Sequence, residues 1–341
     1  MIKQKHMQTF YRHIIKEAWD LTRKHAFLWP LAFLTSLIGV AGTFQILFDL
    51  NRDDSSMTIQ SLYTRSDFMT STFVGWNQSF DTIPWADVSL LDLPFILFFF
   101  VLLLVIVAVA IIITSSEGGL IFALGKLQAN KTTSYLPSLR NGLDKFWALF
   151  SINLIYRLLY LIAIAVVIIP LISVIPRSTP TGTLMLAIIV YFIVIPLIML
   201  LDLVARYSLM YIMLQGNTIR DALYNAWLLF RTNWIISVET AILLLAALFV
   251  SVILLSAVAY GVVFLFAMFG AFVAISPAAL QIFAVTSIVI LILIAAVFVT
   301  FFSAMQMSIW VGVFRRINAS EHPSKIHRLL RHVSWLHKRI A

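Results

Sequence analysis

The chain has 341 residues, of which 61% are hydrophobic and only 11% are charged, and its formal net charge is +9. Soluble domains are less than half apolar and about a quarter charged, so this composition excludes a soluble globular protein, a coiled coil and a disordered chain. The sequence contains no cysteine, which excludes disulfide scaffolds, thiol nucleophiles and cysteine-ligated metal centres. The expected fold class is therefore an all-α membrane protein.

Six stretches of the chain are long and apolar enough to be transmembrane helices, because about 20 apolar residues cross a hydrocarbon core of about 30 Å. They lie at residues 26–48, 93–114, 154–175, 183–204, 234–258 and 280–304. The segment 259–275 is also apolar. The sequence leaves three interpretations of it open: an extension of the fifth span, a re-entrant segment or a seventh span.

The uneven distribution of basic residues predicts the orientation of the spans. With six spans, 20 of the 24 lysine and arginine residues fall on one side of the membrane. Basic loops stay in the cytoplasm, so we expect a multi-pass protein of the cytoplasmic (inner) membrane with both termini cytoplasmic. The first span is expected to be an uncleaved anchor. A seventh span would place the basic tail, residues 305–341, outside, which favours six spans.

The cytoplasmic charge also predicts a partner. Basic residues next to a membrane attract anionic lipid headgroups, each contributing about 1 kcal/mol, whereas nucleic-acid binding would need a motif that the chain lacks. The predicted external loop at 49–92 carries seven aspartates and two arginines. Acidic residues contribute little to topology, so this loop is either a solvated connection or a surface for a protein partner.

An internal repeat links the cytoplasmic segments. Residues 139–155 and 219–235 are identical at seven of 17 positions when they are aligned without gaps. In both copies the apolar residues recur at the spacing of one helical face, which predicts amphipathic connector helices with tryptophans at the headgroup level. Such helices either pack the spans together or bind a partner. A weaker copy lies near the N-terminus, and the anchor residues of the three copies are Arg12 and Trp19, Arg140 and Trp147, and Arg220 and Trp227.

The repeat divides the chain into three units of two spans each, at residues 1–114, 115–205 and 206–304. Units that share one orientation are related by an axis along the membrane normal. We therefore expect six transmembrane helices arranged as three two-span hairpins with pseudo-threefold symmetry.

Two ionisable residues lie well inside the predicted spans, Arg157 in the third and Glu239 in the fifth. When the repeats are aligned, their depths differ by only two residues, or about 3 Å. A charge that faces lipid costs about 2.5–3.5 kcal/mol on insertion scales, so we expect an intramembrane polar pair or a small polar cluster. The alternative is that Arg157 reaches the cytoplasmic headgroups alone and Glu239 is protonated.

The sequence has no motif for catalysis, a cofactor or a metal. It lacks a glycine-rich phosphate loop and the histidine and serine motifs of hydrolases. Asp49, Asn51 and Asp53 resemble the start of a calcium loop, but Asp54 occupies the glycine position and Gln60 the last ligand position. The histidines of the tail are five residues apart and do not share a helix face. No catalytic, cofactor-binding or metal-binding residue is therefore expected.

Paired spans with the segments 117–155 and 206–235 between them resemble the polytopic membrane domain associated with bacterial glycerophosphoryl diester phosphodiesterases and related bacterial membrane proteins. The resemblance covers most of residues 115–316 and implies a bacterial integral membrane protein. The catalytic phosphodiesterase domain is absent, so that activity is not implied. Mitochondrial carriers also have three two-span units, but their Pro-x-Asp/Glu-x-x-Lys/Arg signature is missing from the odd-numbered spans.

These observations favour a non-enzymatic integral membrane protein that organises lipid or partner proteins. The alternative is a transporter or channel whose pathway follows the pseudo-symmetry axis. Transport sites need polar residues near the midplane or spans broken by glycine or proline. Pro170 and Pro196 lie inside predicted spans, but charge is nearly absent there, which favours the first function.

Overall fold

The computed structural model describes residues 10–39, 93–174, 180–273 and 277–319, and the regular elements in these ranges are all helices. The expected all-α class is confirmed for this part of the chain. The predicted external loop and the basic tail from residue 320 onward lie outside the described residues. In chain order the helices are α2 (Phe10–Lys24), α3 (Leu28–Gly39), α7 (Leu93–Gln128), α8 (Tyr135–Asp144), α9 (Phe146–Val174), α10 (Pro180–Met210), the π-helix η3 (Tyr211–Gln215), α11 (Ile219–Val273) and α12 (Pro277–Asn318).

Five helices are long and apolar enough to cross a membrane: α7, α9, the continuous α10–η3 helix, α11 and α12. Helix α3 is apolar but has only 12 residues. The rest of the first predicted span, residues 40–48, lies outside the described residues. The membrane class is thus supported by five helices, and the sixth span stays a prediction.

Proline marks the start of three of these helices. Pro180 and Pro277 are the first residues of α10 and α12, and Pro94 is the second residue of α7. Proline suits the first turn because the amide it lacks would have no partner within the helix there. Pro196 lies inside α10, which continues through it.

Helix α11 shows which of the three interpretations applies to the described part of the segment 259–275. It runs for 55 residues, with one non-helical residue at Asn233 that separates the predicted connector from the predicted span. Residues 259–273 continue the same helix. Over these residues the segment is therefore an extension of the fifth span and not a re-entrant loop.

The helices pack together at one end, in a buried cluster that we call the hub. Away from the hub, most of the apolar side chains of the long helices are exposed. The hub contains parts of α2 and α3, the C-terminal part of α7, the starts of α9 and α11, η3, and the C-terminal ends of α10 and α12. Its buried residues include Ile14, Leu28, Leu124, Ile152, Tyr207, Ile212, Ile236 and Phe314.

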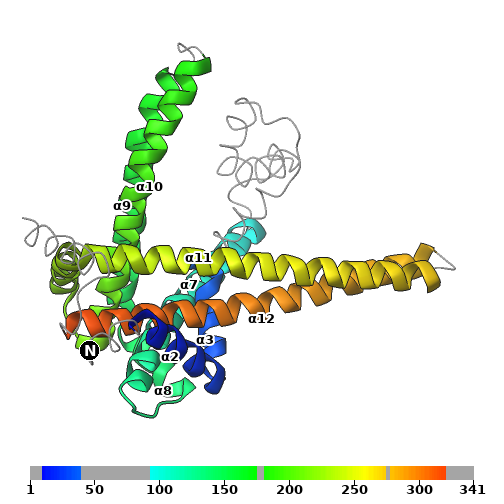
Figure 1. The fold of residues 1–341 in the computed structure, drawn as a ribbon, viewed down its shortest axis with the longest axis horizontal. Helices are drawn as coiled ribbons and strands as arrows, with labels where there is room; N and C mark the ends of the chain where they lie inside the picture. Colours follow the sequence, from blue (N-terminus) through cyan, green and yellow to red (C-terminus); the bar gives the residue numbers. More distant parts are fainter. Residues whose placement is uncertain (1–9, 40–92, 175–179, 274–276, 320–341) are drawn as a thin grey trace, which may run out of the picture.

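Three pairs of helices pack against each other. Helix α3 packs on α7 within the hub, α9 packs on α10 and α11 packs on α12. Figure 1 shows α9–α10 and α11–α12 as two long arms that leave the hub in different directions. We still predict from the sequence that three such pairs are related by a pseudo-threefold axis.

Helix α8 packs on α7 so closely that glycine is required at the contact. A Cβ atom on Gly119 would lie 2.9 Å from the carbonyl oxygen of Ser138, and one on Gly142 would overlap the carbonyl oxygen of Ser115. In both positions the obstacle is backbone, which moves only if the helices separate. The predicted connector is therefore held on α7 by contact between the two backbones.

We expect Gly142→Ala to lower thermal stability, because the added methyl group overlaps the backbone of α7 and overpacking costs about 1–3 kcal/mol. Melting of the purified protein in detergent, followed by tryptophan fluorescence, measures this loss. Gly261→Ala is the matched control, since no atom lies within 4 Å of the added methyl group and alanine favours a helix. Equal melting temperatures for the two variants would contradict the close α7–α8 contact.

Candidate functional site

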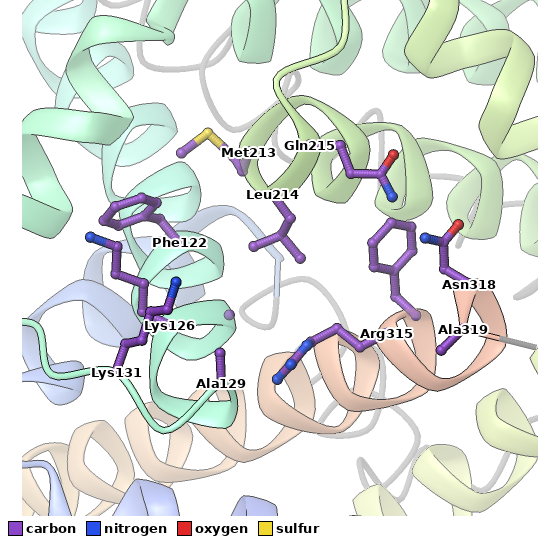
Figure 2. Close-up of a pocket in the computed structure, with 12 residues that line it drawn as sticks. Phe122, Lys126, Ala129, Lys131, Met213, Leu214, Gln215, Arg315, Asn318 and Ala319 are labelled. Carbon is purple, nitrogen blue, oxygen red and sulfur yellow. The ribbon is translucent and has the colours of Figure 1, made fainter. Parts of the chain in front are cut away.

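A pocket of about 410 Å³ lies at the hub, between the end of α7, the π-helix η3 and the end of α12 (Figure 2). This volume falls in the range of small-ligand sites, which are about 300–1,000 Å³. The lining combines an apolar wall with three cations: Phe122, Met213, Leu214 and Phe314 form the wall, and Lys126, Lys131 and Arg315 carry the charge.

The turn after α7 brings Lys131 to the pocket beside Lys126. Helix α7 ends at Gln128, and Asn130 adopts a φ of 55°, a left-handed conformation that asparagine tolerates better than most residues. The amide of Lys131 then donates to the carbonyl oxygen of Lys126 at 2.9 Å. Figure 2 shows the Arg315 side chain extending from α12 toward the side where both lysines lie.

The apolar wall is in direct contact with the charged rim. The Lys126 ammonium lies 4.6 Å from the centroid of the Phe122 ring, a cation–π contact. Gly125 leaves space for Leu214 of η3 to lie against α7, because a Cβ atom at residue 125 would overlap the Leu214 side chain. The pocket thus presents a charged edge and an apolar surface side by side.

Contacts between helices fix the walls of the pocket. The side-chain amide of Gln128 donates to the carbonyl oxygen of Ser308 at 2.9 Å, which joins α7 to α12. The Tyr211 hydroxyl donates to Asn318 Oδ1 at 3.2 Å, and its ring meets the Phe314 ring edge-on at 4.9 Å between centroids. These contacts between helices hold the walls of the pocket together.

The electrostatic balance of the pocket is positive. No acidic residue is found among the described residues that line it. The carboxyl ends of α7, η3 and α12 each add about −0.5 of an elementary charge, so they reduce the three full positive charges by about half. The pocket can bind an anion with an apolar tail, because the charge and the apolar wall are adjacent.

Lys145, in the break between α8 and α9, supports the pocket from behind. Its ammonium donates to the carbonyl oxygen of Ile212 in η3 at 2.6 Å, and the amide of Gly216 donates to the same oxygen at 3.2 Å. Partial burial lowers the pKa of Lys145, because the charged amine loses solvation. Lys145 is thus a positioning residue for the π-helical wall, and π-helical turns occur frequently at functional sites.

A second group of polar residues lies nearby, where α7, α9 and α10 meet. Asn153 donates to Glu117 at 2.8 Å, and Arg206 forms an ion pair with Asp202 at 2.7 Å. Both Arg206 and Arg157 interact electrostatically with the Glu117 carboxylate. Opposite charges therefore compensate one another in this cluster, which we call the Glu117 cluster.

The structure gives the predicted intramembrane pair different neighbours. Arg157 is exposed and belongs to the Glu117 cluster, while Glu239 accepts a hydrogen bond from the Tyr11 hydroxyl at 2.6 Å. Among the described residues, Arg157 and Glu239 do not form an ion pair with each other. The acidic residue near Arg157 is Glu117, and the expectation that Arg157 and Glu239 pair or share one polar cluster stays a prediction.

The predicted anchor tryptophans lie on exposed surfaces. Trp19 on α2 is 48% exposed, Trp147 on α9 is 76% exposed and Trp227 on α11 is 46% exposed. The anchor arginines of the same copies, Arg12, Arg140 and Arg220, are exposed as well.

The helical breaks differ between the copies. Residues 219–230 form one continuous helix, whereas residues 139–150 are interrupted at Lys145. The second copy therefore has its tryptophan after the break and the third copy has it before the break. Sequence identity alone did not reveal this difference, because the interrupted and the continuous segment share the same matched residues.

The pocket residues could not be singled out from the sequence. Lys126, Lys131, Arg206 and Arg315 counted there only among the basic residues that set the orientation, and Glu117 and Asp202 had no predicted role. Each of these residues lies next to an apolar run in the sequence, and this position was the signal that could have marked them. Among the described residues no group of histidines, cysteines or carboxylates could hold a metal ion, and the calcium-like segment and the tail histidines lie outside them.

Comparisons with protein-family models, with characterised proteins and with solved structures find no match to this chain.

Replacing Lys145 should change how stability depends on pH. The pKa of Lys145 is lower in the folded protein than in the unfolded chain. Between the folded-state pKa and the ordinary lysine pKa of about 10.4, the unfolded chain holds the proton and the folded protein does not. The free energy of unfolding therefore rises with pH through this window. Thermal melts from neutral to alkaline pH should show this rise in the original protein and a smaller one in Lys145→Met. Lys24→Met, on the exposed end of α2, controls for the lost charge, and the same slope in all three proteins would contradict the role of Lys145.

Proposed function

We propose that this chain is a non-enzymatic integral membrane protein that binds anionic phospholipid headgroups on the cytoplasmic side and organises lipid around itself. The observation that carries the proposal is the basic pocket with its apolar wall. Basic pockets between transmembrane helices on the cytoplasmic side bind phosphorylated headgroups. A phospholipid has both features that the pocket complements, a phosphate and an acyl chain.

The proposed orientation agrees with the place of the pocket. The hub holds the ends of α7, η3 and α12, which carry the basic residues that the positive-inside rule assigns to the cytoplasm. The exposed Trp147 and Trp227 would then lie at the headgroup level, as interfacial tryptophans do. We extend this to six spans in three hairpins with both termini cytoplasmic, in the cytoplasmic membrane of a bacterium, as the resemblance to phosphodiesterase-associated membrane domains suggests.

Lipid binding tests the proposal directly. The double variant Lys126→Gln/Arg315→Gln should bind phosphatidylglycerol about 30-fold more weakly, because each basic residue contributes about 1 kcal/mol. Binding of phosphatidylcholine should not change. Native mass spectrometry of the purified protein, titrated with each lipid at physiological ionic strength, measures both affinities.

The control is Lys16→Gln/Lys24→Gln, which removes the same charge from the exposed face of α2. Exposed charges are screened at this ionic strength, so this variant should keep nearly the original affinity. Equal losses in the two double variants would show that net charge rather than the pocket binds the lipid. Unchanged binding in Lys126→Gln/Arg315→Gln would rule the pocket out.

The topology can be checked because the chain has no cysteine of its own. Cysteines introduced at Asn130 and Gln215 should react with a membrane-impermeant maleimide only after the cells are permeabilised, since both positions are at the basic ends of helices. A cysteine between residues 55 and 85 should react in intact cells. Reaction of a cysteine near residue 330 from outside would contradict the six-span arrangement.

A transporter or channel is the second candidate, and the Glu117 cluster is the observation that favours it. Ionisable residues within transmembrane segments commonly mark ion or proton pathways. The cluster is compensated, because Arg206 pairs with Asp202 and the two arginines interact with Glu117, and this favours a structural role. Ion flux in proteoliposomes that is lost in Glu117→Gln would favour transport over lipid organisation.

A further inference from the structure

The arm formed by α11 and α12 contains no charge along most of its length. From Thr240 to Phe314 the sequence has no aspartate, glutamate, lysine, arginine or histidine. Two hydroxyl side chains in this stretch donate within their own helix, Thr240 to the carbonyl oxygen of Ile236 at 2.8 Å and Thr300 to that of Ala296 at 2.6 Å. The described part of the arm therefore offers water no charged group.

The arm is also longer than a bilayer is thick. At 1.5 Å per residue, α11 extends about 51 Å from Glu239 to its end at Val273. Its partner α12 extends about 38 Å from Pro277 to Phe302, just before its first hub residue, Ala304. The hydrocarbon core measures about 30 Å, and transmembrane helices tilt by about 20° on average and at most about 40°. Even at 40° the apolar part of α11 would project about 39 Å along the membrane normal.

Apolar side chains are exposed on all sides of the arm except where its two helices meet. Leu248 and Leu255 of α11 pack with Phe302 of α12. Val263, Phe264 and Leu265 are consecutive and all exposed, and consecutive helical residues point about 100° apart. Toward the far end, Phe269 is 62% exposed.

This distribution identifies what covers the arm. A protein partner would bury one face and leave a polar surface elsewhere, and water would require polar residues at the far end. Helices that are apolar all round are surrounded by an apolar medium. Lipid acyl chains are the occupant that this surface fits, because they contact every side of the hairpin.

We infer that the whole α11–α12 arm is embedded in lipid and that the protein thickens the bilayer around its far end, or selects a thick one. Hydrophobic mismatch of this kind costs fractions of a kcal/mol per Å and sorts proteins among membranes of different thickness. Figure 1 shows the arm leaving the hub in a different direction from α9–α10. The two arms therefore cannot both lie along the membrane normal.

Single cysteines in the cysteine-free chain test this inference. Phe249 and Phe269 are matched positions, since both are exposed phenylalanines on α11, at 50% and 62%. They lie about 15 Å and 45 Å beyond Glu239 along the helix. Each Phe→Cys variant is placed in nanodiscs with one protein copy per disc, in phosphatidylcholines of short, medium and long acyl chains. The measured quantity is the rate of reaction with a water-soluble maleimide.

Phe269→Cys should react slowly in long-chain discs and about tenfold or more faster in short-chain discs, because water is excluded from the hydrocarbon core. Phe249→Cys should react slowly in every lipid. Leu136→Cys, on the exposed surface of α8, should react rapidly in every lipid and shows that the reagent reaches the protein.

Three outcomes would overturn the inference. Reaction of Phe269→Cys as fast as Leu136→Cys in long-chain discs would mean that the end of the arm projects into water. Slow reaction in every lipid would mean that the bilayer thickness does not limit the arm. Fast reaction in single-copy discs, combined with slow reaction in vesicles that hold many copies, would assign the cover to a second copy of the chain.

Discussion

The packing of helix ends in the hub is the contact on which the rest of this structure depends. The Tyr207 side chain is fully buried there, its hydroxyl lies 2.8 Å from Ser237 Oγ on α11, and its ring meets those of Trp310 and Phe314 on α12. The long arms contact mainly their own partner helices beyond the hub. The hub therefore sets where each arm begins, and we propose that lipid surrounds what lies beyond it.

The pocket is a consequence of the same packing. Helices that end together bring their last residues together, and in this chain those residues are basic because they face the cytoplasm in the proposed topology. The apolar wall comes from the hub itself, through side chains such as Phe314 that are buried on one side and line the pocket on the other. A lipid phosphate in the pocket would be bound where the α11–α12 arm leaves the hub, and we infer that the far end of this arm needs a thick bilayer. Headgroup binding and bilayer thickness would then act on the same local lipids.

Much of the fold was predictable, because a long apolar run has few alternatives to a membrane helix. The bounds were less predictable. Helix α7 continues past residue 114 to Gln128, since the polar run after Ile113 packs into the hub instead of meeting water. The break at Lys145 was not predicted either, because it is set by contacts with η3. The pocket depends on Lys126 and Arg315, which are far apart in the sequence, and no local pattern predicts that they meet.

A cryo-EM reconstruction of the protein in nanodiscs that contain phosphatidylglycerol would show whether the pocket holds a lipid. We expect density for a phosphate between Lys126, Lys131 and Arg315, with an acyl chain along the wall formed by Phe122 and Leu214. A pocket filled by the protein's own side chains, with phospholipid headgroups ordered elsewhere on the surface, would contradict this expectation.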